Sequence, residues 1–204
     1  GKGLSNYSED QYEAISFGKS TSENAINLIN DTLNAAVVGR SEPRFKFKLN
    51  DISRVLENII LEYLIVAKDR GIELTFERPQ IPVPLFFFDS SQMYLAIHDL
   101  VHNAIKYTKD GGKVAVKLES VGTSAKITIK DNGIGIPAGQ IDKIFNKFFR
   151  VDNAKKIEEK GSGLGLFIAK KIITRHNGNI EIQSKENEGT TIIIILPLPQ
   201  MEQK

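Results

Sequence analysis

The chain has 204 residues, with 27 Lys and Arg against 25 Asp and Glu, a net charge of +2 and no cysteine. Its 41% hydrophobic and 25% charged residues exclude a largely disordered chain. The lack of Cys excludes disulfides, thiolate zinc sites and a cysteine nucleophile, and fits a reducing compartment. The balanced charge argues against binding of nucleic acid through its phosphates. No apolar run approaches the roughly 18 residues of a membrane helix, so any membrane contact is expected in segments outside this sequence.

Residues 1–45 are polar but carry one apolar stripe. Its members, at spacings typical of a coiled coil, are Ile15, Ser22, Ile26, Ile29, Leu33 and Ala36. With Ser8 as N-cap and Gly39 and Pro43 beyond its end, the pattern predicts a helix over about 9–37. A helix with one apolar stripe needs a helical partner, in this chain or in another.

Residues 46–198 alternate between strand and helix patterns. In the first half, the expected elements are a strand at 45–49, a helix capped by Asn50 and ended by Gly71, strands at 72–76 and 85–88, and a helix from Asp89 to Tyr107. In the second half, they are a hairpin at 114–118 and 126–130, a short helix at 140–149, a polar loop at 150–162, a helix at 163–176 and a hairpin of 180–182 with 191–196. Because the late strands come as hairpins, we predict an α+β fold: a two-layer sandwich of a mixed sheet with helices on one face.

The first motif with possible chemistry is Asp131–Pro137, which reads Asp-Asn-Gly-Ile-Gly-Ile-Pro after a predicted strand. Its two glycines allow a planar ligand to approach the backbone, and its carboxylate can accept a hydrogen bond from an exocyclic amine. An Asn-Gly turn between strands explains the same residues.

The second motif, Gly161–Leu166, reads Gly-Ser-Gly-Leu-Gly-Leu at the start of a predicted helix. Free N–H groups at a helix N-terminus, with glycines beside them, form an anion site. The alternative is a flexible loop before an ordinary helix. The motif is not a phosphate-binding loop of the Walker type, and its glycine spacing differs from that of a dinucleotide fingerprint.

The third motif is a helix face on which Asp99, Asn103, Lys106 and Tyr107 recur at i, i+4, i+7 and i+8. Carboxylate and amide oxygens suit a hard divalent cation, and Mg²⁺ commonly joins few protein ligands to substrate phosphates. A solvated helix face is the alternative. A His98–His102 pair without a third ligand is more often structural than metal-binding.

These motifs, in this order, resemble the ATP-binding domain of two-component sensor histidine kinases, in the GHKL ATPase superfamily. The matching segments are Asp99–Thr108 for the N box, Asp131–Pro137 for the G1 box, Phe145–Arg150 for the F box, Gly161–Leu166 for the G2 box and 188–191 for the closing hairpin. The resemblance implies a Bergerat-type ATP-binding fold over 46–198. It also implies that 1–45 hold the second helix of the dimerisation and histidine-phosphotransfer hairpin with a linker, and that 199–204 are a tail.

The resemblance also implies residue roles. Asn103 would coordinate Mg²⁺, Asp131 would accept the adenine amine, and Asn103, Lys106 and Arg150 would be catalytic. At the phosphates, Asp99 would contact Mg²⁺ through water, Lys106 would contact phosphate, and Arg150 would contact phosphate or the transition state, with Lys155 and Lys156 as weaker candidates for that role. At the base, Tyr107 would pack near the adenine or ribose, Gly133 and Gly135 would lie along the adenine, and Thr190 would support the adenine end through water. The residues of the ATP lid would be Gly161, Ser162, Gly163, Leu164, Gly165 and Leu166.

No histidine of the chain fits the family's acceptor pattern, because His98 and His102 lie in the N box and His176 ends the helix after the G2 box. We therefore expect transfer of the ATP γ-phosphoryl to a histidine outside this chain, for relay to the receiver domain of a response regulator. The full-length protein would be a homodimer through the helical hairpin, and this region would be cytoplasmic in a bacterial sensor. The alternative is a GHKL-type ATPase with Asp99 as general base; a third reading is a non-catalytic nucleotide-binding module.

Overall fold

A computed structural model describes residue 11 and residues 45–157 and 161–199. Its elements are β1 (Lys48–Asn50), α2 (Ile52–Asp69), β2 (Glu73–Glu77), β3 (Phe86–Phe88), α3 (Ser90–Tyr107), β4 (Lys113–Val121), β5 (Ser124–Asp131), the 3₁₀ helix η1 (Ala138–Lys143), α4 (Asp152–Ile157), α5 (Gly165–Arg175), β6 (Asn179–Lys185) and β7 (Gly189–Pro197). Apart from residue 11, the helix expected at 9–37 lies outside the described residues.

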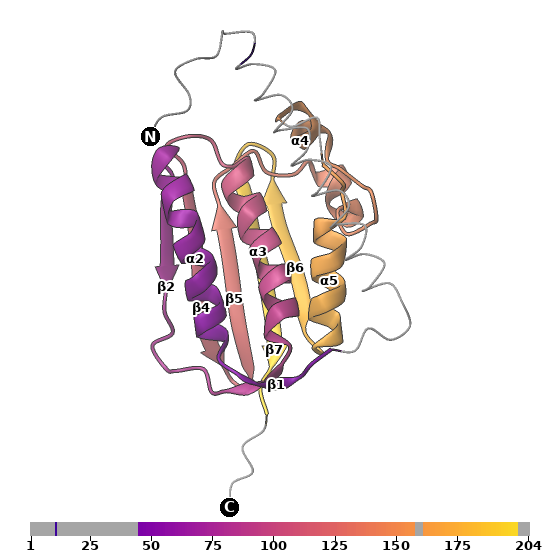
Figure 1. Cartoon of the computed structure of the whole chain (residues 1–204). Helices are drawn as coiled ribbons and strands as arrows, with labels where there is room; N and C mark the ends of the chain where they lie inside the picture. The colour runs from indigo at the N-terminus through magenta and orange to yellow at the C-terminus, as the bar shows by residue number, and fades with distance from the viewer. Residues whose placement is uncertain (1–10, 12–44, 158–160, 200–204) are drawn as a thin grey trace, which may run out of the picture.

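The main sheet has five strands in the order β2-β4-β5-β7-β6. β2 runs parallel to β4, and the other neighbours are antiparallel. Helices α2, α3 and α5 lie side by side over one face of this sheet, as Figure 1 shows. A second, two-stranded sheet pairs β1 with β3 where the chain enters the domain. The predicted two-layer sandwich with a mixed sheet is confirmed.

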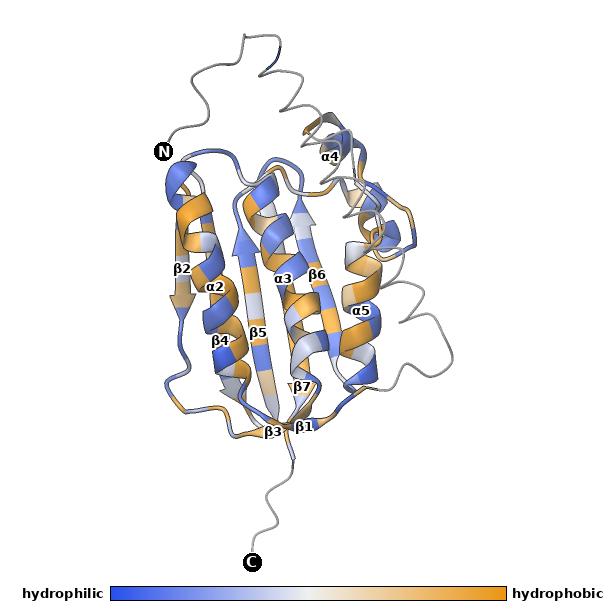
Figure 2. Cartoon of the chain, in the orientation of Figure 1, coloured by the Kyte–Doolittle hydropathy of each residue, from blue (hydrophilic) through white to orange (hydrophobic). Residues whose placement is uncertain are grey.

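The core fills the space between the sheet and the three helices. Each helix is amphipathic, with orange and blue bands alternating along it in Figure 2. Side chains with no exposed surface are contributed by both layers, among them Leu56, Ile59, Ile97, Leu100, Val116, Leu118, Ile127 and Ile194. Burying each such aliphatic side chain stabilises the fold by about 1.5–3 kcal/mol. Among the described helices, none is long and apolar enough to span a membrane.

Helix ends follow the local sequence with one correction. Asp89 caps α3, as predicted, because its Oδ1 accepts a hydrogen bond from the Gln92 N–H at 3.1 Å. The predicted cap of α2, Asn50, is wrong, since the side chain of Asp51 accepts from the Ser53 N–H instead. The Asn50 amide is used across the strands, where it donates to the Phe88 carbonyl at 2.8 Å.

The stretch between the two glycine motifs also differs from the prediction. The short helix predicted at 140–149 is instead the 3₁₀ helix η1, and the loop predicted at 150–162 contains α4. A tertiary contact holds the first turn of α4: the Gln140 amide donates to Asp152 Oδ2 at 2.7 Å and accepts from the Asp152 N–H at 3.1 Å. Local pattern does not reveal a helix that depends on such a contact.

The end of α5 is joined to the start of α3 through His176, which is only 6% exposed. Its Nε2 accepts a hydrogen bond from the Asp89 N–H at 3.0 Å, so its Nδ1–H donates to the Ile172 carbonyl at 2.8 Å. Asp89 Oδ2 in turn accepts from the Lys46 N–H at 2.7 Å. The entering chain and the two helices that border the pocket described below therefore meet at one point.

Candidate functional site

A cavity of about 1130 Å³ opens between α3, the G1 segment after β5 and the segments Phe149–Ile157 and Gly161–Leu166. This volume suffices for a ligand of nucleotide size. All but two of the residues predicted for the site line the cavity: Asp99, Asn103, Lys106, Tyr107, Asp131, Gly135, Arg150, Gly161, Ser162, Gly163, Gly165, Leu166 and Thr190. Of the remaining two, Leu164 is buried in the core, and Gly133 packs beneath the end of α3.

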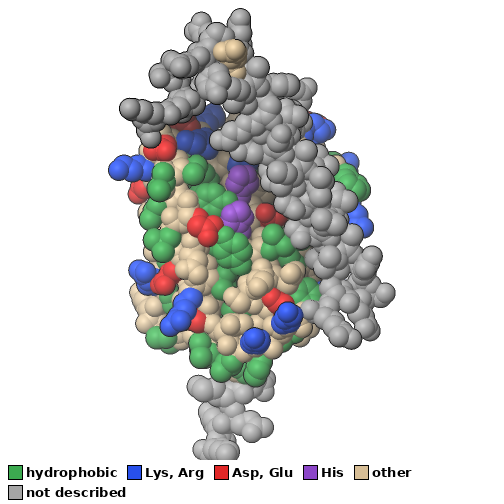
Figure 3. All heavy atoms as spheres, viewed as in Figure 1, with side chains coloured by type: hydrophobic (Ala, Val, Ile, Leu, Met, Phe, Trp, Pro, Cys, Tyr) green, Lys and Arg blue, Asp and Glu red, His purple; other side chains and the backbone are tan. Residues whose placement is uncertain are grey.

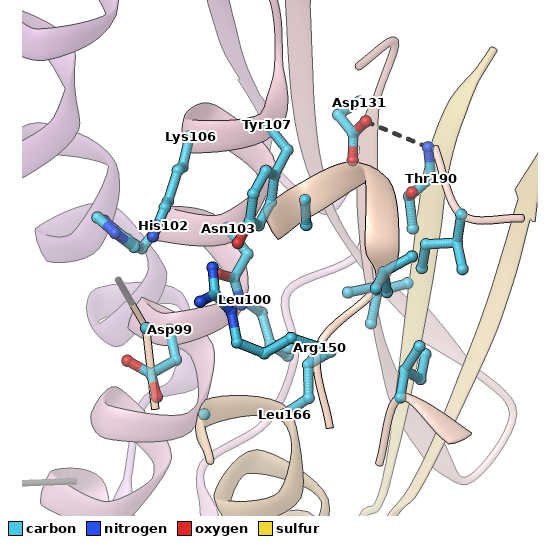
Figure 4. A pocket seen from close by; sticks show the side chains of 18 of the residues that line it. Asp99, Leu100, His102, Asn103, Lys106, Tyr107, Asp131, Arg150, Leu166 and Thr190 are labelled. Carbon is cyan, nitrogen blue, oxygen red and sulfur yellow. Dashed lines mark hydrogen bonds between the residues drawn. The ribbon is translucent and has the colours of Figure 1, made fainter. Parts of the chain in front are cut away.

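Asp131 lies at the last position of β5, at one end of the cavity (Figure 4). Its Oδ1 accepts backbone N–H groups from Gly133 at 2.8 Å and Thr190 at 3.2 Å. Burial raises the pKa of this carboxyl above its usual value, and the two N–H donors act against that rise. With Oδ1 occupied, Oδ2 is available to accept a hydrogen bond from a ligand.

The glycines of the G1 segment are required by the protein's own packing. A Cβ at Gly133 would lie 2.3 Å from the Tyr107 carbonyl oxygen, and one at Gly135 would lie 1.9 Å from the Lys185 carbonyl oxygen. Gly135 also has a φ of +60°, which favours glycine. The segment is thereby clamped between the end of α3 and the β6–β7 hairpin, which fixes the position of Asp131 next to it.

The polar face of α3 forms one wall of the cavity. Figure 4 shows the side chains of Asp99, Asn103 and Tyr107 along this wall, with Asp99 far from Asp131. The Lys106 ammonium lies 5.5 Å from the centre of the Tyr107 ring. The cavity therefore has a carboxylate acceptor at one end and an amide, a cation and a second carboxylate toward the other.

Arg150 extends across the cavity toward Asn103 and Tyr107 (Figure 4). Burial raises the pKa of the Tyr107 hydroxyl, whereas the charge of Arg150 and its hydrogen bond to that hydroxyl lower it. A Cβ at Gly161 would lie 3.2 Å from Arg150 Cζ, so the first glycine of the G2 segment gives the guanidinium its room. Arg150 and Lys106 both contribute a positive charge to the lining of the cavity.

The G2 segment joins the F box and leads into α5. The Phe148 N–H donates to the Gly163 carbonyl at 3.0 Å, and both residues have positive φ, 62° and 66°. No side-chain hydrogen bond caps α5 at Leu164, so the helix presents its first N–H groups without a side-chain cap. The Asp99 carboxylate approaches this end: Oδ2 lies 3.1 Å from the Cβ position of Gly165.

Two histidines occupy the centre of the helical face shown in Figure 3, beside the cavity. The Tyr63 hydroxyl lies 3.0 Å from His98 Nε2 and 3.1 Å from His102 Nδ1. Although one side of His102 reaches solvent, its surroundings of protein lower the pKa of its imidazole, and Lys106 lowers it further. Among the described residues no group of His, Cys, Asp or Glu suited to holding a metal by itself is present.

Sequence reasoning missed Asn153, which lies in α4 and lines the cavity. Its Nδ2 donates to the Gly135 carbonyl at 2.9 Å, so α4 rests on the G1 segment. The surrounding stretch is polar and charged, and nothing in its pattern distinguishes this residue. Of the weaker lysine candidates, Lys155 pairs with Asp152 at 2.8 Å, and the side chain of Lys156 lies outside the described atoms.

The fold and this cavity define a two-layer α/β domain with a cavity of nucleotide size between its helical layer and two glycine-rich segments. Residues 88–200, more than half of the chain, match the family of histidine kinase-, DNA gyrase B- and HSP90-like ATPases. The chain therefore belongs to this family, as its motifs predicted.

Similar proteins include the sensor protein kinase WalK of Staphylococcus aureus, 36% identical over 92% of this chain and 45% of that protein. The chain thus spans less than half the length of this relative. Among solved structures, a mycobacterial sensor histidine kinase, MprB, is 29% identical over 76% of this chain and 100% of its own, with a TM-score of 0.62. Full-length ShkA in complex with AMPPNP shares the fold over 95% of this chain and 40% of its own, at 20% identity and a TM-score of 0.78.

Proposed function

We propose that this chain is the ATP-binding catalytic module of a sensor histidine kinase, which binds ATP with Mg²⁺ and transfers the γ-phosphoryl group to a histidine outside this chain. The observation that carries the proposal is the polarity of one cavity. Asp131 stands at one end with an oxygen available to a ligand, and Arg150, Asn103 and Lys106 stand toward the other. Adenosine triphosphate has the complementary order, an amine at one end and anionic oxygens at the other.

At the adenine end, Asp131 selects a donor. Its Oδ1 is committed to two backbone N–H groups, so Oδ2 faces the ligand as an acceptor. The exocyclic amine of adenine satisfies it, whereas guanine presents a carbonyl oxygen at the same position and would meet it acceptor to acceptor. A buried polar group of this kind discriminates strongly, because the wrong ligand leaves it unpaired.

At the phosphate end, the donor set fits Mg²⁺ bound jointly by protein and substrate. Asn103 would provide an amide oxygen and Asp99 a carboxylate oxygen through water, which is few ligands for a protein-only metal site. When bound, Mg²⁺ neutralises part of the charge that develops on the transferred phosphoryl group. Arg150 and Lys106 would orient the phosphates and add positive charge without needing to move a proton.

The phosphoacceptor is proposed to lie elsewhere because the chain's three histidines are otherwise engaged. His176 is buried with both ring nitrogens hydrogen-bonded, and His98 and His102 both bond Tyr63. Relay to a response regulator follows by analogy with the neighbour ThkA, whose structure is a complex with the response regulator TrrA. A homodimer formed through the helical hairpin, and a cytoplasmic location in a bacterial sensor, belong to the same proposal.

The test is incubation of the pure chain with γ-labelled ATP and Mg²⁺, alone and with the helical hairpin of its own full-length protein. We expect an acid-labile, base-stable label on the added hairpin and none on this chain. Stoichiometric label on His98, His102 or His176 would contradict the proposal. So would equal affinity for ATP and GTP in calorimetry.

A further inference from the structure

A pair of hydroxyl groups joins the two strands of the β6–β7 hairpin next to Asp131. Ser184 of β6 lies directly opposite Thr190 of β7, and their side-chain oxygens are 2.8 Å apart. Thr190 lines the cavity, and its N–H donates to Asp131 Oδ1 at 3.2 Å (Figure 4). The hairpin packs closely here, because a Cβ at Gly189 would lie 2.1 Å from the Asp131 carbonyl oxygen. Thr190 therefore belongs to the same end of the cavity as Asp131.

The Ser184 hydroxyl has three hydrogen-bonding partners. Its Oγ accepts a hydrogen bond from the Ile136 N–H in the G1 segment at 2.9 Å. It donates to the Gly189 carbonyl at 2.9 Å, and its third partner is Thr190 Oγ1. A hydroxyl has one hydrogen and two acceptor lone pairs, so three partners use its whole capacity.

The two backbone partners determine which hydroxyl donates to the other. An N–H can only donate and a carbonyl oxygen can only accept, so the single hydrogen of Ser184 lies toward Gly189. Ser184 then meets Thr190 as an acceptor, and the Thr190 O–H supplies the hydrogen between the two oxygens. With its only hydrogen used in this way, Thr190 Oγ1 has nothing but acceptor lone pairs left for a ligand or a water molecule in the cavity.

We propose that Ser184 is a positioning residue for base recognition, which acts by keeping the Thr190 hydroxyl an acceptor toward the bound nucleotide. The inference rests on the proposed function, which puts the base beside Asp131. Asp131 Oδ2 and Thr190 Oγ1 then both require a hydrogen from the base or from a water molecule bound with it. The adenine amine has two hydrogens to give, whereas the guanine carbonyl oxygen at the same position has none.

Without the Ser184 oxygen, the Thr190 hydroxyl is free to rotate. Its hydrogen can then turn toward a carbonyl oxygen of the base, directly or through a water molecule, so this end of the cavity no longer presents acceptors alone. Ser184 does not itself line the cavity, so its substitution reaches the base through Thr190. The loss of its contacts with Ile136 and Gly189 would weaken the binding of both nucleotides alike.

The test is a double-mutant cycle on the whole chain in Mg²⁺, with wild type, Ser184→Ala, Thr190→Val and the double variant. Calorimetry measures the affinity for ATP, and displacement of ATP measures the affinity for GTP. We expect the preference for ATP over GTP to be about 3- to 10-fold smaller in Ser184→Ala than in wild type. The isosteric Thr190→Val protein has no hydroxyl to orient, so adding Ser184→Ala to it should leave its preference unchanged.

The Thr190→Val background is the matched control, because Ser184→Ala removes the same backbone contacts in both backgrounds. An unchanged preference in Ser184→Ala would overturn the inference, as would an equal change in the two backgrounds. If Ser184→Ala does not fold, Ser184→Cys takes its place, since a thiol is a weak donor and a weak acceptor. Failure of wild type to bind ATP, or equal binding of ATP and GTP by wild type, would instead refute the proposed function, so the two failures are distinguishable.

Discussion

Replacing Asp131 by Asn tests the adenine end of the site with little disturbance of the fold. Asp131 Oδ1 accepts from the N–H groups of Gly133 and Thr190, and the carbonyl oxygen of an Asn can accept both. Those two donors fix the amide, so its NH₂ group takes the place of Oδ2. The ligand-facing atom changes from an acceptor to a donor while the backbone contacts stay.

The magnitude follows from the bond that is lost. A hydrogen bond to a charged group contributes about 1.5–3 kcal/mol, and here the adenine amine would also face another donor. We therefore expect Asp131→Asn to weaken ATP binding by about 10- to 100-fold or more. The same NH₂ group can donate to the guanine carbonyl, so the preference for ATP over GTP should shrink or reverse.

Calorimetry with ATP and GTP on both proteins measures this change, and thermal unfolding shows whether the fold is kept. Asp142→Asn is the matched control, because it removes one carboxylate from the exposed surface of η1, away from the cavity lining. It should leave both affinities unchanged. ATP binding by Asp131→Asn within twofold of wild type would refute the adenine assignment.

Three further predictions follow from the structure. Gly135→Ala should lower the melting temperature by several degrees, because its φ is +60° and its Cβ would meet the Lys185 carbonyl; Gly139→Ala, with open space around it, should not. Burial lowers the pKa of His176, so its contribution to the free energy of unfolding is complete above about pH 6.5 and is lost as pH falls through the lowered value. Denaturant melts between pH 5 and 8 should show this loss in wild type but less of it in His176→Gln; equal pH dependence would contradict the prediction. The Asp99→Asn protein should still transfer phosphate to the added hairpin. If wild type instead hydrolyses ATP steadily, Asp99→Asn loses this hydrolysis, and neither protein transfers label, the ATPase alternative would be favoured.

The fold was predictable because its signals are local. Alternating apolar residues mark β4 and β5, a continuous apolar run marks β7, and the N-cap of α3 is visible in the pair Asp89 and Gln92. The tertiary contact that holds the start of α3 in place could not be predicted from this pair. The Asp89 N–H bonds to His176, 87 residues away, and no local pattern indicates a contact of that separation.

The site was predictable to the extent that each residue type implies a chemistry. A carboxylate beside two glycines pointed to Asp131, and helical spacing put Asn103 and Lys106 on one face. The lid was harder, because α4 is six residues long and depends on the contact of Gln140 with Asp152. Asn153 was missed for the same reason, because its hydrogen bond to the Gly135 carbonyl joins residues 18 positions apart and no local pattern indicates it.

The position of Asp99 bears on the choice between kinase and hydrolase. A general base must face a water molecule that lies in line with the γ-phosphoryl group. Asp99 Oδ2 instead lies 3.1 Å from the Cβ position of Gly165, against the first turn of α5, and its Oδ1 lies 4.0 Å from His98 Nδ1. The N-terminal end of a helix is a favourable place for a negatively charged side chain. Under the proposed function, we therefore expect Asp99 to orient a water ligand of Mg²⁺ and not to act as the general base of a hydrolase.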